Sequence, residues 1–261
     1  MQSPQLLLSN TSSFFFGGIK AAFQNARKYG FDGLEIIPYR WTSPGEILSL
    51  EKRYGIKVAG IHLPPWWNKN LWQAVREPSS LFEKTLAPVW HLFLGSARNS
   101  AGLAIARVLA ERKPYVLMHS NVTIEAANEF SALTKTFDIV VENITYYPQY
   151  APPLWDPGLA RQKYQANGVR CGLVFDPGHF SRAVAKLPGT NPVETYKQAR
   201  PEIIHISYNS ATVHGLPNSE EQKELQAMLK IHQPRYIVLE TNPFVSIKKG
   251  KEMLDGLLKS I

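Results

Sequence analysis

The sequence contains a single cysteine, Cys171, among its 261 residues. One thiol cannot form an internal disulfide, and such a composition fits a reducing compartment. The chain also lacks any stretch close to the roughly 20 apolar residues that cross a bilayer. Two early apolar runs, Leu6 to Leu8 and Phe14 to Phe16, follow no basic segment and are too short for a signal sequence. We therefore expect a cytoplasmic protein that does not interact with membranes.

Acidic residues are fewer than basic ones, with 21 Asp and Glu against 29 Lys and Arg, and the net charge is +8. This excess favours polyanionic partners such as nucleic acids or phosphorylated compounds. The basic residues are nevertheless scattered along the chain, as expected for solvated helices. Their densest cluster is Lys248, Lys249 and Lys251, near the C-terminus. A nucleic-acid partner is therefore an alternative rather than the first expectation.

Short apolar segments alternate with longer amphipathic ones along the whole chain. The expected strands are Gln5 to Asn10, Gly33 to Ile37, Lys57 to Leu63, Tyr115 to Ser120, Ile139 to Ile144, Cys171 to Pro177, Ile203 to Tyr208 and Arg235 to Thr241. The expected helices are Gly18 to Tyr29, Pro44 to Tyr54, part of Ser79 to Arg112, Thr123 to Thr136, Asp156 to Asn167, Pro192 to Ala199, Ser219 to Ile231 and Ile247 to Lys259. Eight strand–helix units in series predict a parallel (β/α)8 barrel, the TIM barrel of the α/β class. No linker interrupts the alternation, so we expect one domain over residues 1–261.

In such a barrel the functional groups come from the C-terminal ends of the strands. The last inward-facing residue of six expected strands is a potential metal ligand: His62, His119, Glu142, Asp176, His205 and Glu240. Period-two alternation supports this placement, because each ligand of the last four strands lies two residues after a branched apolar one. These pairs are Val140 and Glu142, Val174 and Asp176, Ile203 and His205, and Val238 and Glu240.

A single buried His or Glu is more often a hydrogen-bonded structural residue than a ligand. Six such residues at equivalent strand ends instead predict a divalent metal. The closest set in sequence order is Glu142, Asp176, His205 and Glu240, from four consecutive strands. Mixed carboxylate and imidazole ligands without thiols suit Mn²⁺, Co²⁺ or Zn²⁺. After Asp176, Pro177 and Gly178 break the strand, so that His179 can turn back towards the carboxylate.

The ordered motifs resemble those of the xylose isomerase-like TIM-barrel superfamily. They are Gly30 to Glu35, Glu142-Asn143, Asp176-Pro177-Gly178-His179, His205, and Leu239 to Pro243. The resemblance implies a sugar isomerase or epimerase of carbohydrate metabolism, with one Mn²⁺, Co²⁺ or Zn²⁺ ion, and Mg²⁺ less suited. The positions of Glu142, Asp176, His205 and Glu240 would hold the ion. The two glutamates would act as acid and base on a ketose or hydroxy-ketone, sugar or sugar phosphate, through an enediolate, and His179 would orient a substrate oxygen.

The same superfamily includes the endonuclease IV group, which cleaves DNA at abasic sites with up to three zinc ions. Its ligand positions match His62, His119, Glu142, Asp176, His179, His205, His214 and Glu240. That family has an aspartate two residues before the position of His214, where this chain has Thr212, and no acidic residue occurs from Ile206 to Val213. The missing carboxylate favours the isomerase. A barrel that binds a small molecule without converting it is a third hypothesis.

Two further features are less specific. Trp66 and Trp67 follow the expected strand end at His62 and could stack on a sugar ring, enter a base stack, or pack a lid over the barrel. Glu35, near the end of the expected second strand, could support a ligand through a hydrogen bond, but a salt bridge inside the barrel mouth is the first expectation.

Overall fold

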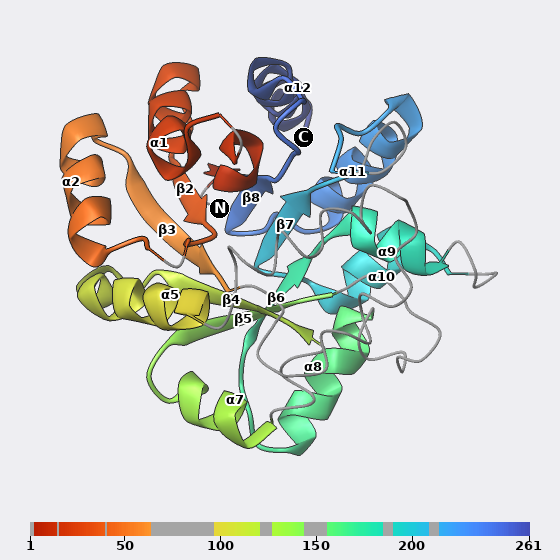
Figure 1. Ribbon diagram of the computed structural model, residues 1–261. Coiled ribbons are helices and arrows are strands. Elements are labelled where there is room, and N and C mark those ends of the chain that lie inside the picture. Colours follow the sequence, from red (N-terminus) through yellow and green to blue (C-terminus); the bar gives the residue numbers. More distant parts are fainter. Residues whose placement is uncertain are drawn as a thin grey trace, which may run out of the picture.

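Eight parallel strands form a closed barrel in the order of the sequence, as expected (Figure 1). The computed structural model describes residues 3–14, 16–39, 41–63, 97–120, 127–143, 156–184, 190–208 and 214–261. The strands are β1 (Gln5–Ser9), β2 (Gly33–Ile36), β3 (Lys57–His62), β4 (Tyr115–His119), β5 (Asp138–Glu142), β6 (Gly172–Phe175), β7 (Ile203–Ile206) and β8 (Tyr236–Leu239). The protein is an α/β (β/α)8 barrel.

The helices of the described residues surround the ring of strands (Figure 1). They are α1 (Gly18–Tyr29), α2 (Pro44–Tyr54), α5 (Ala97–Val108), α7 (Ala127–Thr134), α8 (Pro157–Ala166), α9 (Pro177–Val184), α10 (Pro192–Ala199), α11 (Ser219–Ile231) and α12 (Ile247–Lys259), with short 3-10 turns η1 (Asn10–Ser13) and η2 (Ala110–Arg112). Within the described part of the chain, no helix is long and apolar enough to cross a membrane.

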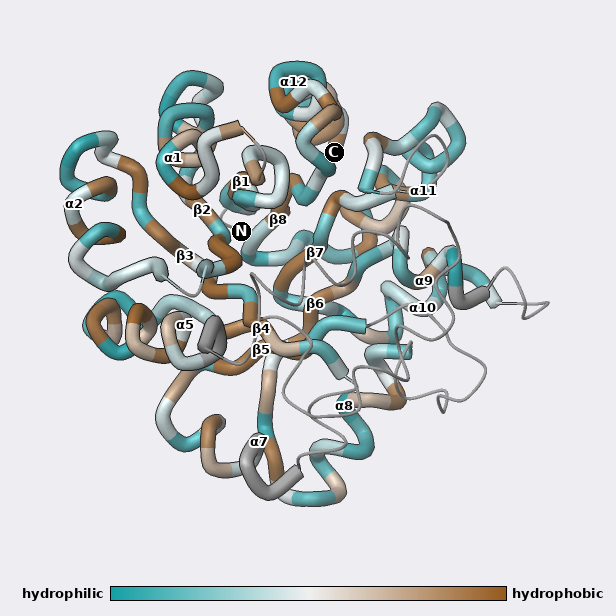
Figure 2. The backbone as a smooth tube through the Cα atoms, viewed as in Figure 1, coloured by the Kyte–Doolittle hydropathy of each residue, from teal (hydrophilic) through white to brown (hydrophobic). Residues whose placement is uncertain are grey.

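Side chains of the strands separate into an inner and an outer apolar cluster. The inner cluster fills the barrel with Leu7, Tyr115, Leu117, Val140, Val174, Ile203, Tyr236 and Val238. The outer cluster contains the alternate residues of the same strands, such as Leu8, Val141 and Ile204, packed against the helices. Figure 2 shows the apolar strands enclosed by helices whose other faces are hydrophilic. The period-two alternation predicted for the last four strands is therefore confirmed.

Strand β3 departs from this alternation. The pairing with β2 shifts between Leu34–Val58 and Glu35–Gly60, so Ala59 is an extra residue in β3. Ala59 packs against the inner cluster, whereas Val58 and Ile61 belong to the outer one. Such a bulge places two successive residues on one face of the strand. It therefore turns Gly60 and His62 towards the barrel interior.

Candidate metal centre

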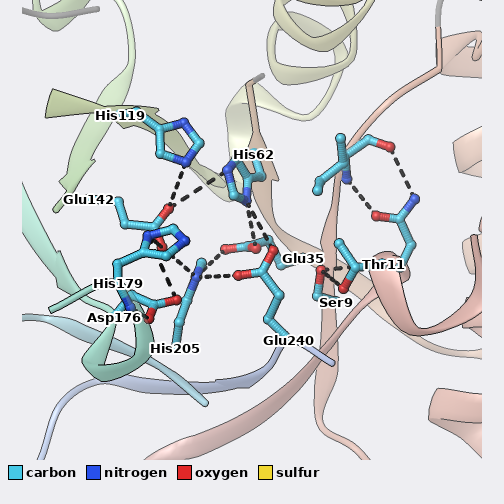
Figure 3. A network of polar contacts seen from close by, with 12 residues as sticks. Ser9, Thr11, Glu35, His62, His119, Glu142, Asp176, His179, His205 and Glu240 are labelled. Carbon is cyan, nitrogen blue, oxygen red and sulfur yellow. Dashed lines mark hydrogen bonds and ion pairs between the residues drawn. The ribbon is translucent and has the colours of Figure 1, made fainter. Parts of the chain in front are cut away.

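The six strand-end residues predicted as ligands meet at one mouth of the barrel (Figure 3). All six are buried: His62, His119, Glu142, Asp176, His205 and Glu240. They lie at or directly after the C-terminal ends of β3 to β8, above the apolar side chains that fill the barrel. A buried carboxylate must be paired, hydrogen-bonded or bound to a cation, because burying it alone costs several kcal/mol or more.

Four of these residues could share one ion. One potential ligand atom from each of Glu142, Asp176, His205 and Glu240 lies within 4.8 Å of the others. His205 is central, since its Nδ1 lies 3.0 Å from Oε1 of Glu142 and 2.9 Å from Oε2 of Glu240. This is the same quartet that the sequence order favours.

The polar atoms of the quartet are poorly satisfied by the protein itself. Both carboxylate oxygens of Glu142, Oδ2 of Asp176, Nδ1 of His205 and Oε2 of Glu240 are buried without a hydrogen bond. The short contacts of His205 with the two glutamates are ion pairs. Unpaired buried polar atoms are rare in proteins and usually indicate a bound ion, water or ligand. The donor set of three carboxylates and one imidazole fits a divalent metal.

A second group shares Glu142 with the quartet. His62, His119 and Glu142 also offer ligand atoms within 4.8 Å of one another. Oε2 of Glu142 lies 3.3 Å from Nε2 of His119 and 3.7 Å from Nε2 of His62. Glu142 therefore faces the quartet with one oxygen and the two histidines with the other. The mouth therefore contains enough potential ligands for more than one ion.

His179 lies beside Asp176, as the sequence suggested, although by a different route. Pro177 begins α9, a helix that we did not predict, and Asp176 caps it: Oδ1 accepts a hydrogen bond of 2.7 Å from the backbone N–H of His179. The ring of His179 places Nδ1 4.0 Å from Oδ2 of Asp176 and 3.0 Å from the carbonyl oxygen of Asn143. Because a carbonyl oxygen can only accept a hydrogen bond, Nδ1 carries the proton, and Nε2 is the ring nitrogen that could contact a substrate or an ion.

The charges of the mouth shift several pKa values in opposite directions. Burial would raise the pKa of Glu142, but the neighbouring His205 and His119 outweigh it and lower the pKa to about 2. Burial lowers the pKa of His119 to about 3. Burial raises the pKa of Asp176, against the influence of His179. The mouth thus combines buried carboxylates and imidazoles that shift one another's pKa values.

Glu35, at the end of β2, is a residue of the mouth that the sequence did not place among the six candidate ligands. It is completely buried, and its two oxygens contact Tyr115, His205 and His62 at 2.8, 3.1 and 3.3 Å. The expected salt bridge inside the mouth is present as the contact with His205. Its position at a strand end, on the same face as Gly33, is the signal that could have placed it with the other site residues.

The structure also brings His214 to the mouth. Its ring lies 5.9 Å from that of His179, nearly perpendicular to it, and its carbonyl accepts a hydrogen bond from the N–H of Asn242, just after β8. Its backbone has φ of 53°, in the left-handed region. Trp66, Trp67 and Thr212 lie outside the described residues.

Several solved structures share this fold. An AP endonuclease of family 2 from Brucella melitensis is 14% identical, with a TM-score of 0.64 over 97% of this chain and 98% of that one. A probable 3-DHS dehydratase, AsbF, involved in petrobactin synthesis in Bacillus anthracis, is 14% identical, with a TM-score of 0.57 over 98% and 97% of the two chains. A xylose isomerase-like TIM barrel fused to 4-hydroxyphenylpyruvate dioxygenase is 13% identical, with a TM-score of 0.55 over 98% of this chain and 42% of the fusion.

The chain therefore has the (β/α)8 fold of these proteins, and the barrel predicted from the sequence is confirmed. No protein-family model matches the chain, and no curated protein matches it. These barrels perform different reactions, so the activity must be argued from the site itself.

Proposed function

We propose that this xylose isomerase-like barrel binds a divalent metal through Glu142, Asp176, His205 and Glu240, and that it is an isomerase or epimerase of a ketose or hydroxy-ketone. The observation that carries the proposal is the set of buried oxygen and nitrogen atoms of this quartet that make no hydrogen bond within the protein. They come from the ends of four consecutive strands and lie within reach of one ion.

The donor types indicate which ions would bind. Three carboxylates and one imidazole suit Mn²⁺, Co²⁺ or Zn²⁺, whereas Mg²⁺ prefers to keep several waters and mostly oxygen ligands. Among the described residues, the one cysteine, Cys171, directly precedes β6, and burial raises the pKa of its thiol to about 12. A thiolate is therefore no part of this site.

The arrangement of the two glutamates suits proton transfer next to a carbonyl. Glu142 and Glu240 approach His205 from β5 and β8, strands that lie three apart in the ring. Each could exchange a proton with one face of a substrate carbon held between them. A bound divalent ion would supply stabilisation of the negative charge on the enediolate oxygens. His179, held by Asn143 and Asp176, would orient a substrate oxygen through Nε2.

The first test is the metal content of protein purified without added metal or chelator, by inductively coupled plasma mass spectrometry. We expect about one Mn, Co or Zn ion per chain, lost in Glu240→Ala. Proton transfer is then assayed without knowing the product, by deuterium exchange from D2O into a panel of ketoses and hydroxy-ketones. We expect exchange that Glu142→Gln and Glu240→Gln abolish and that Glu51→Gln, a buried glutamate of α2 outside the mouth, retains.

A nuclease of the endonuclease IV type is the second candidate, favoured by the group of His62, His119 and Glu142. A carboxylate shared between two groups of ligands is how a site with more than one ion is built. The net charge of +8 would also suit a DNA substrate. Two or three zinc ions per chain, with cleavage of a duplex that carries an abasic site, would replace the isomerase with this function. A chain that holds no metal even after reconstitution would contradict both activities and favour a non-catalytic binding barrel.

A further inference from the structure

Glu35 lies in the mouth beside the proposed metal quartet but is not part of it. We infer that Glu35 is a positioning residue for His205: it fixes the tautomer and orientation of the imidazole that leave Nδ1 free to bind the metal. This inference rests on the proposed metal site and assigns a role to a residue of another strand, β2.

The first step is that Glu35 acts only as an acceptor. Its Oε2 receives a hydrogen bond of 2.8 Å from the hydroxyl of Tyr115. Burial, with the nearby charge of Glu35, raises the pKa of Tyr115 well above its ordinary value, so the hydroxyl keeps its proton. The hydroxyl donates its hydrogen in this contact, so Oε2 of Glu35 is the acceptor.

The second step concerns the imidazole of His205. Its Nε2 lies 3.1 Å from the same Oε2 of Glu35. Since the carboxylate only accepts, Nε2 must carry a proton. The other nitrogen, Nδ1, is the one that faces Glu142 and Glu240 at 3.0 and 2.9 Å. A neutral His205 with its proton on Nε2 therefore presents the lone pair of Nδ1 to the ion.

The third step separates positioning from direct ligation. Both oxygens of Glu35 have protein partners, because Oε2 accepts from Tyr115 and His205 and Oε1 lies 3.3 Å from Nδ1 of His62. In the quartet, both oxygens of Glu142, Oδ2 of Asp176 and Oε2 of Glu240 make no hydrogen bond, although histidine nitrogens lie 2.9–4.0 Å from them. Metal-binding histidines commonly donate their second ring N–H to a carboxylate, and removal of that carboxylate typically costs 10–100-fold in affinity. Glu35 matches this pattern.

The fourth step is that the support extends into the barrel. Tyr115 belongs to the inner cluster, below the mouth, and Gly60 of β3 faces its ring. A Cβ at Gly60 would collide with that ring, so the glycine is required for Tyr115 to lie where it does. The apolar interior of the barrel thereby fixes the ring of Tyr115. The hydroxyl of Tyr115 donates a hydrogen bond to Glu35, and Glu35 in turn orients His205.

The test compares zinc affinity, stability and the state of His205 in the intact protein and its variants. Zinc affinity is measured by competition with a chelator. We expect Glu35→Ala to bind zinc about 10–100-fold more weakly. Glu35→Gln should lose less, because an amide oxygen can still accept from Nε2 but carries no charge. Nitrogen-15 NMR of the zinc-loaded parent should show a proton on Nε2 of His205 and the metal on Nδ1.

Glu51→Ala is the matched control. Glu51 is also a buried glutamate, 2% exposed, and accepts hydrogen bonds from the backbone of Val58 and from Arg112, away from the mouth. It should lower the melting temperature of the metal-free protein as Glu35→Ala does, yet leave the zinc affinity within about twofold of the parent.

Each other outcome contradicts the inference in a distinct way. Equal zinc affinity of Glu35→Ala and the parent, or zinc on Nε2 of His205, would overturn it and leave the proposed function standing. Loss of a whole ion per chain, with a changed absorption spectrum of the cobalt-substituted protein, would make Glu35 a ligand instead. A parent that binds no zinc would overturn both the proposed function and the inference.

Discussion

Asn143 shows how one side chain can set the geometry of the mouth. The backbone pairing of β5 with β6 ends at Glu142 and Val174, and Asn143 continues it with its amide group. Its Oδ1 accepts a 2.8 Å hydrogen bond from the N–H of Asp176, and its Nδ2 donates one of 3.0 Å to the carbonyl of Asp176. Its own carbonyl contacts Nδ1 of His179. The side-chain amide of Asn143 therefore holds Asp176, and its backbone carbonyl holds His179.

We expect Asn143→Ala to lower the free energy of unfolding of the metal-free protein by about 1–3 kcal/mol, because it leaves the buried backbone N–H of Asp176 unpaired. It should also weaken metal binding, since Asp176 is no longer held in place. Urea unfolding and a chelator competition measure the two effects. Asn167→Ala, which removes an exposed side-chain hydrogen bond to Lys163, should change stability by less than about 0.5 kcal/mol. Unchanged metal affinity in Asn143→Ala would contradict this role.

The sequence predicted the residues that end in the mouth better than the residues that orient them. Potential ligands at strand ends are recognisable because their chemistry is unusual for a buried position. The roles of Asn143 and Glu35 depend on partners far along the chain, such as Tyr115, which lies 80 residues after Glu35. One sequence contains no direct signal for such contacts.

At the scale of the element, the bulge in β3 decides where His62 points. If Ala59 were paired as a regular strand residue, strict alternation would place His62 on the outer face, the same face as Val58. The bulge also places Gly60 on the inner face, against the ring of Tyr115. A β-bulge at the rim of a barrel is a common device for re-aiming a side chain next to a site.

We expect Gly60→Ala to destabilise the protein by about 1–3 kcal/mol or more, because its methyl group collides with the ring of Tyr115 inside a filled barrel. The cost should fall in a Tyr115→Leu background, where the ring is absent. A double-mutant cycle by urea unfolding measures this coupling. Gly256→Ala in α12 is the control, since nothing lies within 4 Å of its added Cβ, and it should be neutral or stabilising. If the effects of Gly60→Ala and Tyr115→Leu on the free energy of unfolding are additive, the added methyl group does not collide with the ring of Tyr115, and the prediction is wrong.

Several helix boundaries were predictable because the chain marks them with a capping residue followed by proline. Ser43, Asp156 and Asn191 each precede a proline and cap α2, α8 and α10 through their side chains. Asp176-Pro177 has the same signature and begins α9, which we missed because the same proline also ends the strand segment. The site residue His179 lies in the first turn of this helix, so the short element matters for function.

At the scale of the whole molecule, the barrel topology gathers side chains that are up to 205 residues apart, from Glu35 to Glu240, at one mouth. This part was predictable, since eight strand–helix units imply a parallel barrel and the ends of its strands must meet. The gathering has an energetic consequence. Four carboxylates, those of Glu35, Glu142, Asp176 and Glu240, are buried together, and their mutual repulsion opposes folding unless cations offset it.

Asp176 is the carboxylate on which this repulsion should be measurable. Burial raises its pKa, although the nearby His179 acts in the opposite direction, and Glu142 raises it further. A carboxyl group whose pKa is higher in the folded protein than in the unfolded chain destabilises the fold when ionised. That cost is absent below the unfolded pKa, grows as the pH rises through the interval between the two values, and is fully present above the folded pKa.

We therefore expect Asp176→Asn to stabilise the metal-free protein at neutral pH, by about 0.5–2 kcal/mol, while it weakens metal binding. The amide keeps the oxygen that caps α9 but removes one negative charge from the mouth. Zinc at about 100 times its Kd should stabilise the parent by about 2.7 kcal/mol and the variant by much less. Asp138→Asn, an exposed aspartate at the other end of β5, should change neither quantity. Urea unfolding with chelator measures the stability of the metal-free protein, and urea unfolding with zinc measures the stabilisation by the ion. If metal-free Asp176→Asn is less stable than the parent, the contacts of Asp176 within the protein stabilise the fold by themselves, and the prediction is wrong.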